Sequence, residues 1–367
     1  MNSWLVRMVG CVAVALLMVA APARGQGACD ADVDGNGTVD GSDLGAVLAA
    51  WGPCAGCAAD VDGSGAVDGG DLGALLVLWG SSCNPLPWAT VLEQSPDPAI
   101  VTSGSLRKAI AATGLPWRVR DNLTQIEMLL IPPGTFNMGC SASNQFGCSS
   151  VENPVHAVTL TNAFYIGRYE VTQAQWTARM GSNPSFFQSA SAQVPAAEVP
   201  NRPVERVSWN MIYGFLDGST TGLRLPTEAE WEYAYRAGTT TAFHGWPAQT
   251  AGTNNDTQVG NIAWYYEGSC SNGAMCQTRP VGGKAPNGFG LHDMSGNVWE
   301  WVNDWYSSGY YASSPSTNPP GPSSGWDRVL RGGSWDYGTN DLRSSRRGYV
   351  TPGSTYYGIG FRVARAP

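Results

Sequence analysis

The stretch RLPTEAEWEYA, residues 224–234, is the clearest helix signal in the chain. Thr227 can cap the start of a helix, and acidic side chains in the first turn favour the helix because they face the positive end of its dipole. Trp231 and Ala234 then fall on one face. Around this helix, residues 114–365 carry many short apolar runs separated by Gly, Asn, Ser and Pro, which predicts short strands joined by long loops.

Composition agrees with a loop-rich domain. Only 14% of the residues are charged, while Gly (46) and Pro (24) are abundant, so coiled coils and long exposed helices are excluded. Two further helices are expected at 172–180 and 209–216. We interpret residues 84–113, which include four Pro before Ile100, as a linker with one short helix at 104–113. The fold class expected for the chain is α+β.

Seven strings place the large domain in a family. They are IPPGTFNMG (131–139), YEVTQAQW (169–176), RPVERVSWN (202–210), RLPTEAEWEYA (224–234), KAPNGFGLHDMSGNVWEW (284–301), RVLRGGSW (328–335) and GFRVAR (360–365). Together they resemble the formylglycine-generating (sulfatase-modifying factor) family. The resemblance implies a mixed α/β domain over residues 114–367, related to C-type lectins, with little regular secondary structure and with bound calcium.

The resemblance also defines the chemistry to look for. Active members oxidise a substrate cysteine to formylglycine with a Cys pair that binds copper(I), the first Cys lying three residues after the Ser of an RGGS motif. Here that Ser is Ser334, the position three residues on is Tyr337, and no Cys follows Cys276. Copper(I) prefers soft thiolate ligands, so we expect no copper and a catalytically silent domain. An oxidoreductase of the formylglycine-generating or non-haem-iron branch, with chemistry not visible in the sequence, is the alternative.

Calcium and groove residues carry over from the resemblance by position. The expected calcium ligands of the large domain are Asp293, Gly296, Val298 and Glu300 at one site, and Asn261 and Ile262 at a second. An ion pair with an arginine is the alternative role for the two acids. The groove candidates are Trp299, Ser334, Trp335 and Tyr337, with Trp301, Trp305, Tyr356 and Tyr357 in or near the same segments. The alternative for each aromatic residue is a place in the core. His156, His244 and His292 have no metal-ligand spacing and are interpreted as surface or packing residues.

An acidic duplication precedes this domain. DVDGNGTVDGSDLGAVLAAWG (32–52) and DVDGSGAVDGGDLGALLVLWG (60–80) are identical at 15 of 21 positions. Each has oxygen ligands at loop positions 1, 3, 5, 7, 9 and 12 and Gly at position 6, which is the pattern of an EF-hand calcium loop. The expected ligands are Asp32, Asp34, Asn36, Thr38, Asp40 and Asp43, and then Asp60, Asp62, Ser64, Ala66, Asp68 and Asp71. A solvated Asp/Gly-rich linker is the alternative.

An apolar stripe with helical spacing follows each loop, but nothing helical is expected before Asp32 or Asp60. A loop with only an exit helix, present twice, resembles the dockerin family and implies a dockerin-like calcium module over residues 28–83. The resemblance implies a cohesin-like or cell-surface scaffold partner, contacted through residues 41–51 and 69–79. Gly stands at three of the four positions (41, 42, 69 and 70) that in dockerins more often carry hydroxyl residues.

Residues 1–25 are typical of a secretory signal peptide, with Arg7 before a short apolar run and small residues at 21–25. An uncleaved anchor is the alternative. Eight Cys remain after the signal, which in an exported chain suggests disulfides. Cys140 and Cys148, and Cys270 and Cys276, each bracket a short polar stretch and are expected to pair. Cys29, Cys54, Cys57 and Cys83 allow three pairings, and a zinc site at Cys54 and Cys57 is the weaker alternative.

These observations give one leading hypothesis. The net charge of −8 comes from the basic-free stretch 26–106, no basic stripe exists, and nucleic-acid binding is therefore not expected. We expect a bacterial protein that is secreted, periplasmic or at the cell surface, without a membrane span. Its calcium module would anchor a silent domain that binds an unknown glycan or peptide. A cellulosome-type accessory in polysaccharide or sulfated-glycan catabolism is a further alternative.

Overall fold

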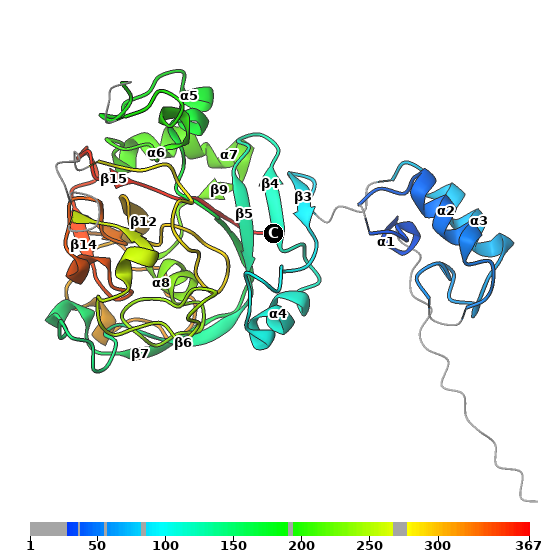
Figure 1. The fold of residues 1–367 in the computed structure, drawn as a ribbon, viewed down its shortest axis with the longest axis horizontal. Coiled ribbons are helices and arrows are strands. Elements are labelled where there is room, and N and C mark those ends of the chain that lie inside the picture. Colours follow the sequence, from blue (N-terminus) through cyan, green and yellow to red (C-terminus); the bar gives the residue numbers. More distant parts are fainter. Residues whose placement is uncertain (1–27, 36, 55–56, 82–85, 190–193, 267–276) are drawn as a thin grey trace, which may run out of the picture. The chain divides into compact units, whose positions relative to one another are not determined.

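A computed structural model describes residues 28–367, except 36, 55–56, 82–85, 190–193 and 267–276 (Figure 1). The chain divides into two compact units, residues 1–84 and residues 85–367, each described by itself below. Within the described ranges, no helix has the length and apolar character needed to cross a bilayer. The predicted signal peptide and the side chains of Asn36, Cys29, Cys83, Cys270 and Cys276 lie outside the described residues.

The small unit is built from two equivalent helices and short paired segments. Its elements are α1 (Ala28–Ala31), α2 (Gly41–Ala49), α3 (Gly69–Val77), β1 (Gly52–Pro53) and β2 (Ala66–Val67). Asp40 and Asp68 cap α2 and α3, each accepting a hydrogen bond from the backbone N–H two residues on. The one-turn helix α1 ends just before Asp32, so the expectation that nothing helical precedes this loop is wrong.

The two repeats of the small unit close onto each other. Gly80 N–H donates to the Val39 carbonyl at 2.8 Å, and Val39 N–H donates to the Ser81 carbonyl at 3.0 Å. At the equivalent positions of the other repeat, Gly52 pairs with Val67 in the β1–β2 ladder. Each loop therefore pairs with the segment that follows the other repeat's helix, and the repeats bury one shared core. That core contains Ala31, Val39, Val47, Ala59, Val61, Val67 and Leu75.

The large unit has many short elements. Its strands are β3 (Ala89–Glu93), β4 (Arg118–Asp121), β5 (Glu127–Ile131), β6 (Gly134–Met138), β7 (His156–Leu160), β8 (Phe164–Gly167), β9 (Leu223–Arg224), β10 (Ala263–Trp264), β11 (Ser295–Gly296), β12 (Trp299–Trp305), β13 (Arg328–Arg331), β14 (Gly348–Val350), β15 (Ile359–Gly360) and β16 (Ala364–Arg365). Its α-helices are α4 (Gly104–Ala111), α5 (Gln173–Met180), α6 (Trp209–Leu216), α7 (Gly218–Thr221) and α8 (Glu228–Arg236). Short 3₁₀ turns include η1 (Ser150–Glu152), η3 (Val259–Asn261) and η6 (Thr339–Leu342).

Two larger sheets contain most of these strands, while β6 pairs with β7 and β10 with β11 in two-stranded sheets. One has the order β3-β4-β5-β8-β16-β9, and the other has the order β14-β13-β12-β15. The C-terminal strand β16 inserts antiparallel between β8 and β9, so the last strand joins the centre of the unit. Helix α8 lies between the sheets in Figure 1, and its Trp231 is fully buried. The domain is thus a mixed α and β fold with short elements and long loops, as predicted.

Three of the helix predictions are confirmed. Helix α8 begins after Thr227, whose Oγ1 accepts from Glu230 N–H at 3.2 Å while the Glu230 carboxylate accepts from Thr227 N–H at 2.8 Å. Helices α5 and α6 match the predicted ranges 172–180 and 209–216 closely. Each of these helices has a local capping signal, which explains why the sequence alone located them.

The prediction of a linker over residues 84–113 is wrong for its described part. Strand β3 pairs antiparallel with β4, with Val91 opposite Val119, and forms the edge of the six-stranded sheet. Val101 and Ile110, the latter on α4, are buried in the main core. The predicted short helix is present as α4, but it packs against the domain. The prolines on either side of β3 favoured the interpretation as a linker. Its partner β4 is distant in sequence, so no local pattern indicated the pairing.

Buried ion pairs tie the long loops together. Glu232 on α8 pairs with Arg236 on the same helix and with Arg331 at the end of β13. Equivalent buried pairs are Glu228–Arg347, Glu152–Arg343 and Glu300–Arg362. An arginine side chain can donate hydrogen bonds to several backbone carbonyls as well as to a carboxylate, so one buried arginine holds several loop segments together. This explains how a domain with little regular structure keeps a defined interior.

Candidate functional site

A cavity of 530 Å³ lies where β12, β14 and β15 meet the chain after β13. Aromatic side chains form much of its wall: Trp299, Tyr337, Tyr349, Tyr356 and Tyr357. Polar side chains at the same cavity are Asp336, Asp341, Arg346 and Arg347. We call this cavity the Tyr337 pocket. A cavity of this size with a few polar groups in an aromatic wall is suited to one side chain or one small ligand.

Tyr337 contributes its ring to the wall of this pocket. The ring packs edge-on against Trp299, with centroids 5.4 Å apart and an interplanar angle of 89°. The Tyr337 carbonyl accepts from Tyr266 N–H at 3.0 Å, which fixes the backbone at this point. Burial raises the pKa of the Tyr337 phenol above its usual range, and Asp336 and Asp341 raise it further. The phenol is therefore neutral at physiological pH.

Two carboxylates differ in their partners. The Asp341 carboxylate pairs with Arg346 at 2.8 Å. Asp336 Oδ1 accepts a hydrogen bond from Ser334 Oγ at 2.5 Å, and Asp336 has no ion pair with any described residue. Gly358 leaves room for Asp336, because a Cβ there would lie 3.0 Å from Asp336 Oδ1.

Only part of the predicted groove lines the pocket. Trp299 and Tyr337 are in its wall, whereas Ser334 is fully buried behind Asp336. Trp335 is also behind the wall, where its ring contacts Phe187 and Tyr357. Trp301 is a core residue whose Nε1–H donates to the Val207 carbonyl at 2.9 Å, and Trp305 stacks on Arg328.

Asp336, Asp341, Arg346 and Tyr349 also line the pocket, although the sequence did not predict them as site residues. Asp336 stands two residues after Ser334, so its position beside the predicted groove residues was available as a signal. The other three come from η6, from the chain after it and from β14, and only the fold brings them to the pocket.

The residues present do not fit a copper(I) site. The resemblance implied two thiolates at Tyr337 and within 339–342, and the pocket has a neutral phenol and a carboxylate paired with arginine at these places. A phenol and a carboxylate are hard oxygen ligands, whereas copper(I) prefers sulfur. No copper-dependent step is therefore assigned to this pocket.

The predicted calcium acids of the large domain have different surroundings. Both oxygens of Glu300 accept from Arg362, at 2.6 and 2.7 Å, and one also accepts from Trp231 Nε1–H at 2.7 Å. Asp293 Oδ2 accepts from Gly282 N–H at 2.6 Å, while its buried Oδ1 has no partner among the described residues. Asp293 is suited to a cation. Glu300 has the ion pair that was its alternative role.

Burial raises the pKa of Asp293 to about 6 and that of the neighbouring Glu170 well above its usual range. Glu170 accepts from Val298 N–H at 3.1 Å and from Asn297 Nδ2 at 2.7 Å. Gly296 has a positive φ of 80°, and a Cβ there would lie 2.1 Å from the Trp264 carbonyl, so only glycine fits.

The second predicted site in the large domain is described only in part. Asn261 is exposed at the end of η3, and its carbonyl accepts from Ala285 N–H at 3.0 Å. Ile262 is buried beside it. Residues 267–276, which follow in the chain, lie outside the described residues.

The acidic loops of the small unit each gather three carboxylates. Ligand oxygens of Asp32, Asp34 and Asp43 lie within 4.8 Å of one another, as do those of Asp60, Asp62 and Asp71. These are loop positions 1, 3 and 12. Among the described residues, no other group of three or more His, Cys, Asp or Glu side chains is arranged in this way.

Backbone N–H groups hold each trio. Asp71 Oδ1 accepts from Asp62 N–H at 3.0 Å and Oδ2 from Asp68 N–H at 2.8 Å, while Asp60 Oδ2 accepts from Gly65 N–H at 2.9 Å. Asp43 has the equivalent bonds in the first loop. Hydrogen bonds to these backbone groups lower the pKa of Asp71 despite its burial.

Asp40 and Asp68, the other predicted carboxylate ligands, are not in the trios. The side chains of Asp40 and Asp68 cap helices, and the hydroxyl of Ser64 donates to the Ala66 carbonyl at 3.0 Å. Thr38, which like Ala66 was expected to offer its carbonyl at loop position 7, is exposed.

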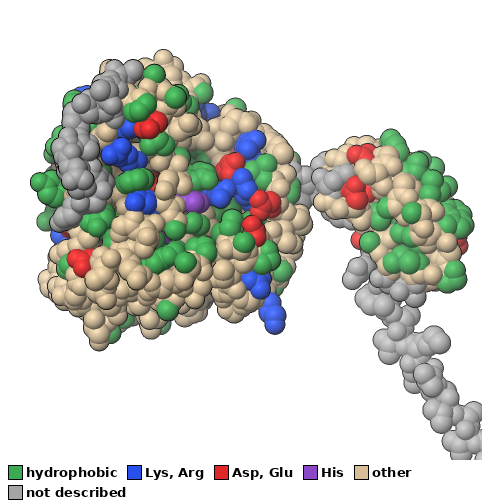
Figure 2. Space-filling view, in the orientation of Figure 1, with side chains coloured by type: hydrophobic (Ala, Val, Ile, Leu, Met, Phe, Trp, Pro, Cys, Tyr) green, Lys and Arg blue, Asp and Glu red, His purple; other side chains and the backbone are tan. Residues whose placement is uncertain are grey.

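The helices that follow the acidic loops bury only part of their apolar stripe. Val47 and Leu75 are buried, while Leu48 and Leu76 are each 53% exposed. Trp51, Val77 and Trp79 are also exposed. Figure 2 shows hydrophobic side chains covering much of one face of the small unit. We call Leu48, Trp51, Leu76, Val77 and Trp79 the apolar helix face.

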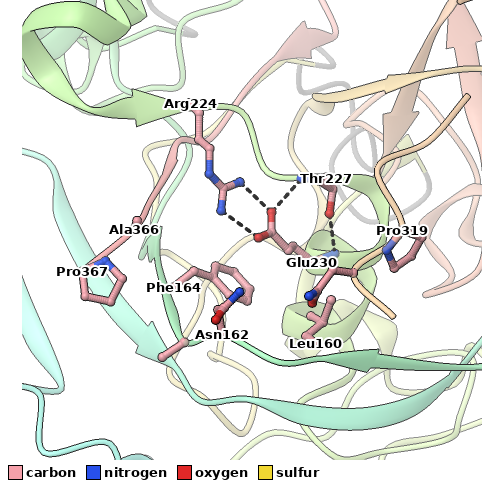
Figure 3. A pocket seen from close by; sticks show the side chains of 11 residues that line it. Leu160, Asn162, Phe164, Arg224, Thr227, Glu230, Pro319, Ala366 and Pro367 are labelled. Carbon is pink, nitrogen blue, oxygen red and sulfur yellow. Dashed lines mark hydrogen bonds and ion pairs between the residues drawn. The ribbon is translucent and has the colours of Figure 1, made fainter. Parts of the chain in front are cut away.

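A second cavity of the large unit, of 490 Å³, lies between α8, the strand β8 and the last residues of the chain (Figure 3). Its charged groups already bind each other, because Arg224 holds Glu230 through two hydrogen bonds of 2.6 and 2.7 Å. Glu230 also caps α8 through Thr227. This cavity contains none of the predicted site residues.

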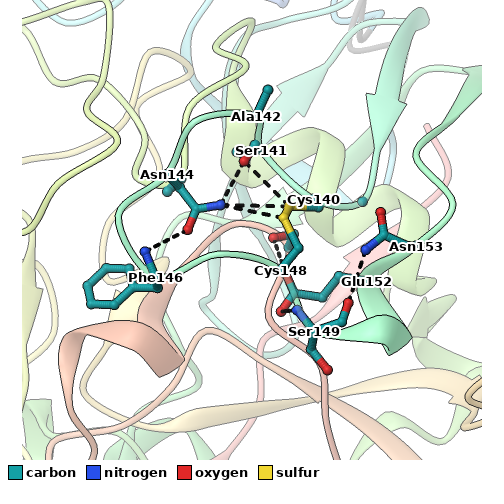
Figure 4. Close-up of a disulfide and its surroundings, with 12 residues drawn as sticks. Cys140, Ser141, Ala142, Asn144, Phe146, Cys148, Ser149, Glu152 and Asn153 are labelled. Carbon is teal, nitrogen blue, oxygen red and sulfur yellow. Dashed lines mark hydrogen bonds between the residues drawn. A yellow bond between two sulfur atoms is a disulfide. The ribbon is translucent and has the colours of Figure 1, made fainter.

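The described cysteines form two disulfides. Cys140 pairs with Cys148, as predicted, and closes the loop before η1 (Figure 4). Cys54 pairs with Cys57, which favours one of the open pairings over the zinc alternative. The Cys140–Cys148 loop is next to a buried ion pair, because Cys140 N–H donates to the carbonyl of Glu152, whose carboxylate binds Arg343.

Comparison with known proteins decides the family. Residues 115–367 match the sulfatase-modifying factor enzyme 1-like domain. The chain belongs to the sulfatase-modifying factor family. The formylglycine-generating enzyme of Streptomyces coelicolor is 33% identical over 303 residues, which cover 70% of this chain and 93% of that protein. The formylglycine-generating enzyme of Bos taurus is 31% identical over 65% of this chain and 74% of its own length.

Solved structures agree with this family assignment. Treponema denticola variable protein 1 has a TM-score of 0.54 and 32% identity, covering 66% of this chain and 95% of that chain. PvdO from Pseudomonas aeruginosa has a TM-score of 0.56 and 29% identity, covering 68% of this chain and 98% of that chain. The sulfatase-modifying factor domain is therefore supported in both sequence and fold.

Proposed function

We propose that the sulfatase-modifying factor domain of this protein is a ligand-binding domain without copper-dependent cysteine oxidation, carried by a calcium-binding module. The observation that carries the proposal is Tyr337. Its ring lines the pocket at the position where the family resemblance requires the first metal thiolate. The pocket keeps its volume and its aromatic wall, and the sequence has no Cys after Cys276 to supply either thiolate.

The physical reason is ligand chemistry. A neutral phenol cannot replace a thiolate on copper(I), and burial keeps the Tyr337 phenol protonated by raising its pKa. Aromatic side chains, in contrast, supply contact area to a ligand without any reactive group. The site is thus equipped for binding rather than for oxidation.

The test is a direct assay. The full chain, copper and oxygen are incubated with a sulfatase-type cysteine peptide, and mass spectrometry measures the aldehyde product. The 33% identical Streptomyces coelicolor formylglycine-generating enzyme is the positive control. We expect no product above the no-protein control. Product above that level would overturn the proposal, as would failure to bind any ligand across a broad glycan and peptide array.

Calcium binding by the small unit is supported by the two carboxylate trios. Three carboxylates in each loop repel one another unless a cation lies between them, and calcium takes six to eight oxygen ligands of this kind. The dockerin-like reading of residues 28–83, and export of the chain, are parts of the same proposal. In the large domain, the proposed calcium site is centred on Asp293, whose Oδ1 is buried and unpartnered among the described residues.

A second role is favoured by the apolar helix face. Leu48 and Leu76 are equivalent in the two repeats, as are Trp51 and Trp79, and all four are exposed. Exposed apolar side chains gathered on one face are typical of a protein interaction site. The proposal is that this face attaches the protein to a cohesin-like or other scaffold partner. Loss of partner capture in a Leu48→Ser, Leu76→Ser variant, with calcium binding retained, is the expected result.

A further inference from the structure

The Tyr337 pocket contains one carboxylate, Asp336, that forms no ion pair with a basic residue of the described part of the chain. Asp341 pairs with Arg346 at 2.8 Å, so these two charges cancel locally. Arg347 donates through two of its nitrogens to Glu228 at 2.7 and 2.9 Å, and Glu228 also lies 3.5 Å from Arg331. Among the described side chains, the hydrogen-bond partner of Asp336 is the neutral hydroxyl of Ser334.

Aromatic rings line the same pocket as this carboxylate. Tyr337, Tyr349, Tyr356 and Tyr357 are between 43% and 55% exposed, and Trp299 completes the wall. The face of an aromatic ring is negative and attracts a cation within about 6 Å of its centre. Rings and an uncompensated carboxylate therefore act in the same direction on a positively charged group.

The charges of the pocket acids affect the pKa of the Tyr337 phenol. Burial is the largest cause of its raised pKa, and the charges of Asp336 and Asp341 raise it further, while Arg346 lowers it. Of the charged groups that act on the Tyr337 phenol, two are acids and one, Arg346, is a base, so negative charge dominates at this side chain. An anionic ligand would be repelled there, and a neutral ligand would gain nothing from the charge of Asp336.

From this arrangement we infer that the Tyr337 pocket binds a protonated amine or guanidinium group on an apolar stem, as in a lysine or arginine side chain of a peptide. The charged group would lie against Asp336, and the stem would pack on the tyrosine rings. This inference rests on the proposed binding role of the pocket and specifies its ligand class.

A row of aromatic contacts leads away from the pocket and favours a peptide over a free amine. Tyr357 in the wall contacts Phe186, with ring centroids 6.2 Å apart, and Trp335, with centroids 5.7 Å apart. Phe186 is 57% exposed. The neighbours of a bound basic residue would thus find apolar surface beyond the pocket.

The experiment uses the full chain and a series of blocked tripeptides whose central residue is lysine, arginine, norleucine or glutamate. Isothermal titration calorimetry measures Kd for each peptide. We expect the lysine and arginine peptides to bind about tenfold more tightly than norleucine, which has the same stem without the charge, and the glutamate peptide to bind most weakly. Raising the salt concentration should weaken lysine binding but leave norleucine binding unchanged.

The diagnostic variant is Asp336→Asn, which keeps an acceptor for Ser334 and removes the charge. It should reduce the lysine preference to within about twofold while the norleucine Kd stays the same. Asp327→Asn, an acid that does not line the pocket, should retain the full preference. Thermal unfolding of both variants verifies folding, and the salt dependence of the wild type tests the charge if Asp336→Asn is unstable.

The outcomes separate this inference from the proposed function. If norleucine peptides or neutral glycans bind as tightly as lysine peptides, or if Asp336→Asn keeps the preference, the ligand class is wrong and the binding role stands. If no peptide and no glycan binds to the wild type, both the ligand class and the binding role are overturned.

Discussion

Glu232 and Arg331 form an ion pair of 2.6 Å in which neither side chain is accessible to solvent. Glu232 is on α8 and Arg331 ends β13, so the pair joins the central helix to the segment that leads into the Tyr337 pocket. Glu232 also accepts from Arg236 and from Gly139 N–H. One carboxylate therefore balances two buried arginines.

Glu232→Gln should destabilise the protein strongly, because it leaves buried guanidinium charge without its carboxylate. We expect a loss of about 3–5 kcal/mol in the free energy of unfolding, measured by urea denaturation. Glu93→Gln is the control, since Glu93 pairs with Arg118 at a partly exposed site and its loss should cost less than about 1 kcal/mol. Equal effects of the two variants would contradict the structural role of the buried pair.

The Cys140–Cys148 disulfide joins two residues that are eight positions apart in the sequence. Replacing both cysteines by serine should lower the free energy of unfolding by about 2–3 kcal/mol, because the unfolded chain gains conformational freedom. Reductant should shift the urea midpoint of the wild type toward that of the variant. Mass mapping of the exported protein should also join Cys270 to Cys276. Free thiols at these four positions, or an unchanged midpoint, would count against the disulfide assignment.

Glu205 gives a prediction about pH. It is fully buried, Oε1 accepts from Phe187 N–H at 2.9 Å, and Oε2 has no partner among the described residues. Burial raises its pKa from 4.5 to about 7. Between these pH values the unfolded chain releases a proton that the folded protein retains, so the free energy of unfolding should fall as pH rises, by about 3 kcal/mol in total.

The Glu205→Gln variant isolates this effect. The free energy of unfolding of this variant should not show the decline that Glu205 causes in the wild type between pH 4.5 and pH 7. The wild type should therefore lose stability relative to the variant as pH rises through this window. Urea unfolding at several pH values supplies the comparison. Parallel pH profiles for the two proteins would show that Glu205 is ionised in the folded state.

Calcium binding by the acidic loops can be counted. Each of Asp32→Asn and Asp60→Asn should reduce the number of calcium ions bound per chain by one, and the double variant by two, because each removes the position-1 carboxylate of one trio. Calorimetric titration of chelator-treated full chain gives the count. Asp30→Asn, an acid outside the trios, should bind as the wild type does. An unchanged count in the double variant would refute the loop assignment.

Local signals explain what the sequence could predict. The starts of α5, α6 and α8 were predictable because a Ser or Thr caps the first turn of each helix. The repeat predicted α2 and α3 through the apolar stripe with helical spacing that follows each acidic loop. The domain family followed from strings of residues that retain their order, without any knowledge of contacts.

Contacts between residues that are distant in the chain explain what the sequence could not predict. The ion pair of Glu300 depends on Arg362, which is 62 positions away, and no local pattern marks it. The pocket role of Asp336 depends on its having no ion pair with a described residue, which a sequence does not display. The two roles proposed for each calcium acid therefore remained open until the fold placed their partners.

The pairing of β3 with β4 affects how the sulfatase-modifying factor domain should be produced as a recombinant fragment. The family match begins at residue 115, but β3 and α4 precede it, and Val101 between them and Ile110 on α4 are part of the core. A fragment starting at 115 would expose the backbone edge of β4 and uncover the apolar surface beneath α4. Such an open strand edge is a template for self-association, so this fragment should aggregate, whereas one starting at 86 should stay monomeric.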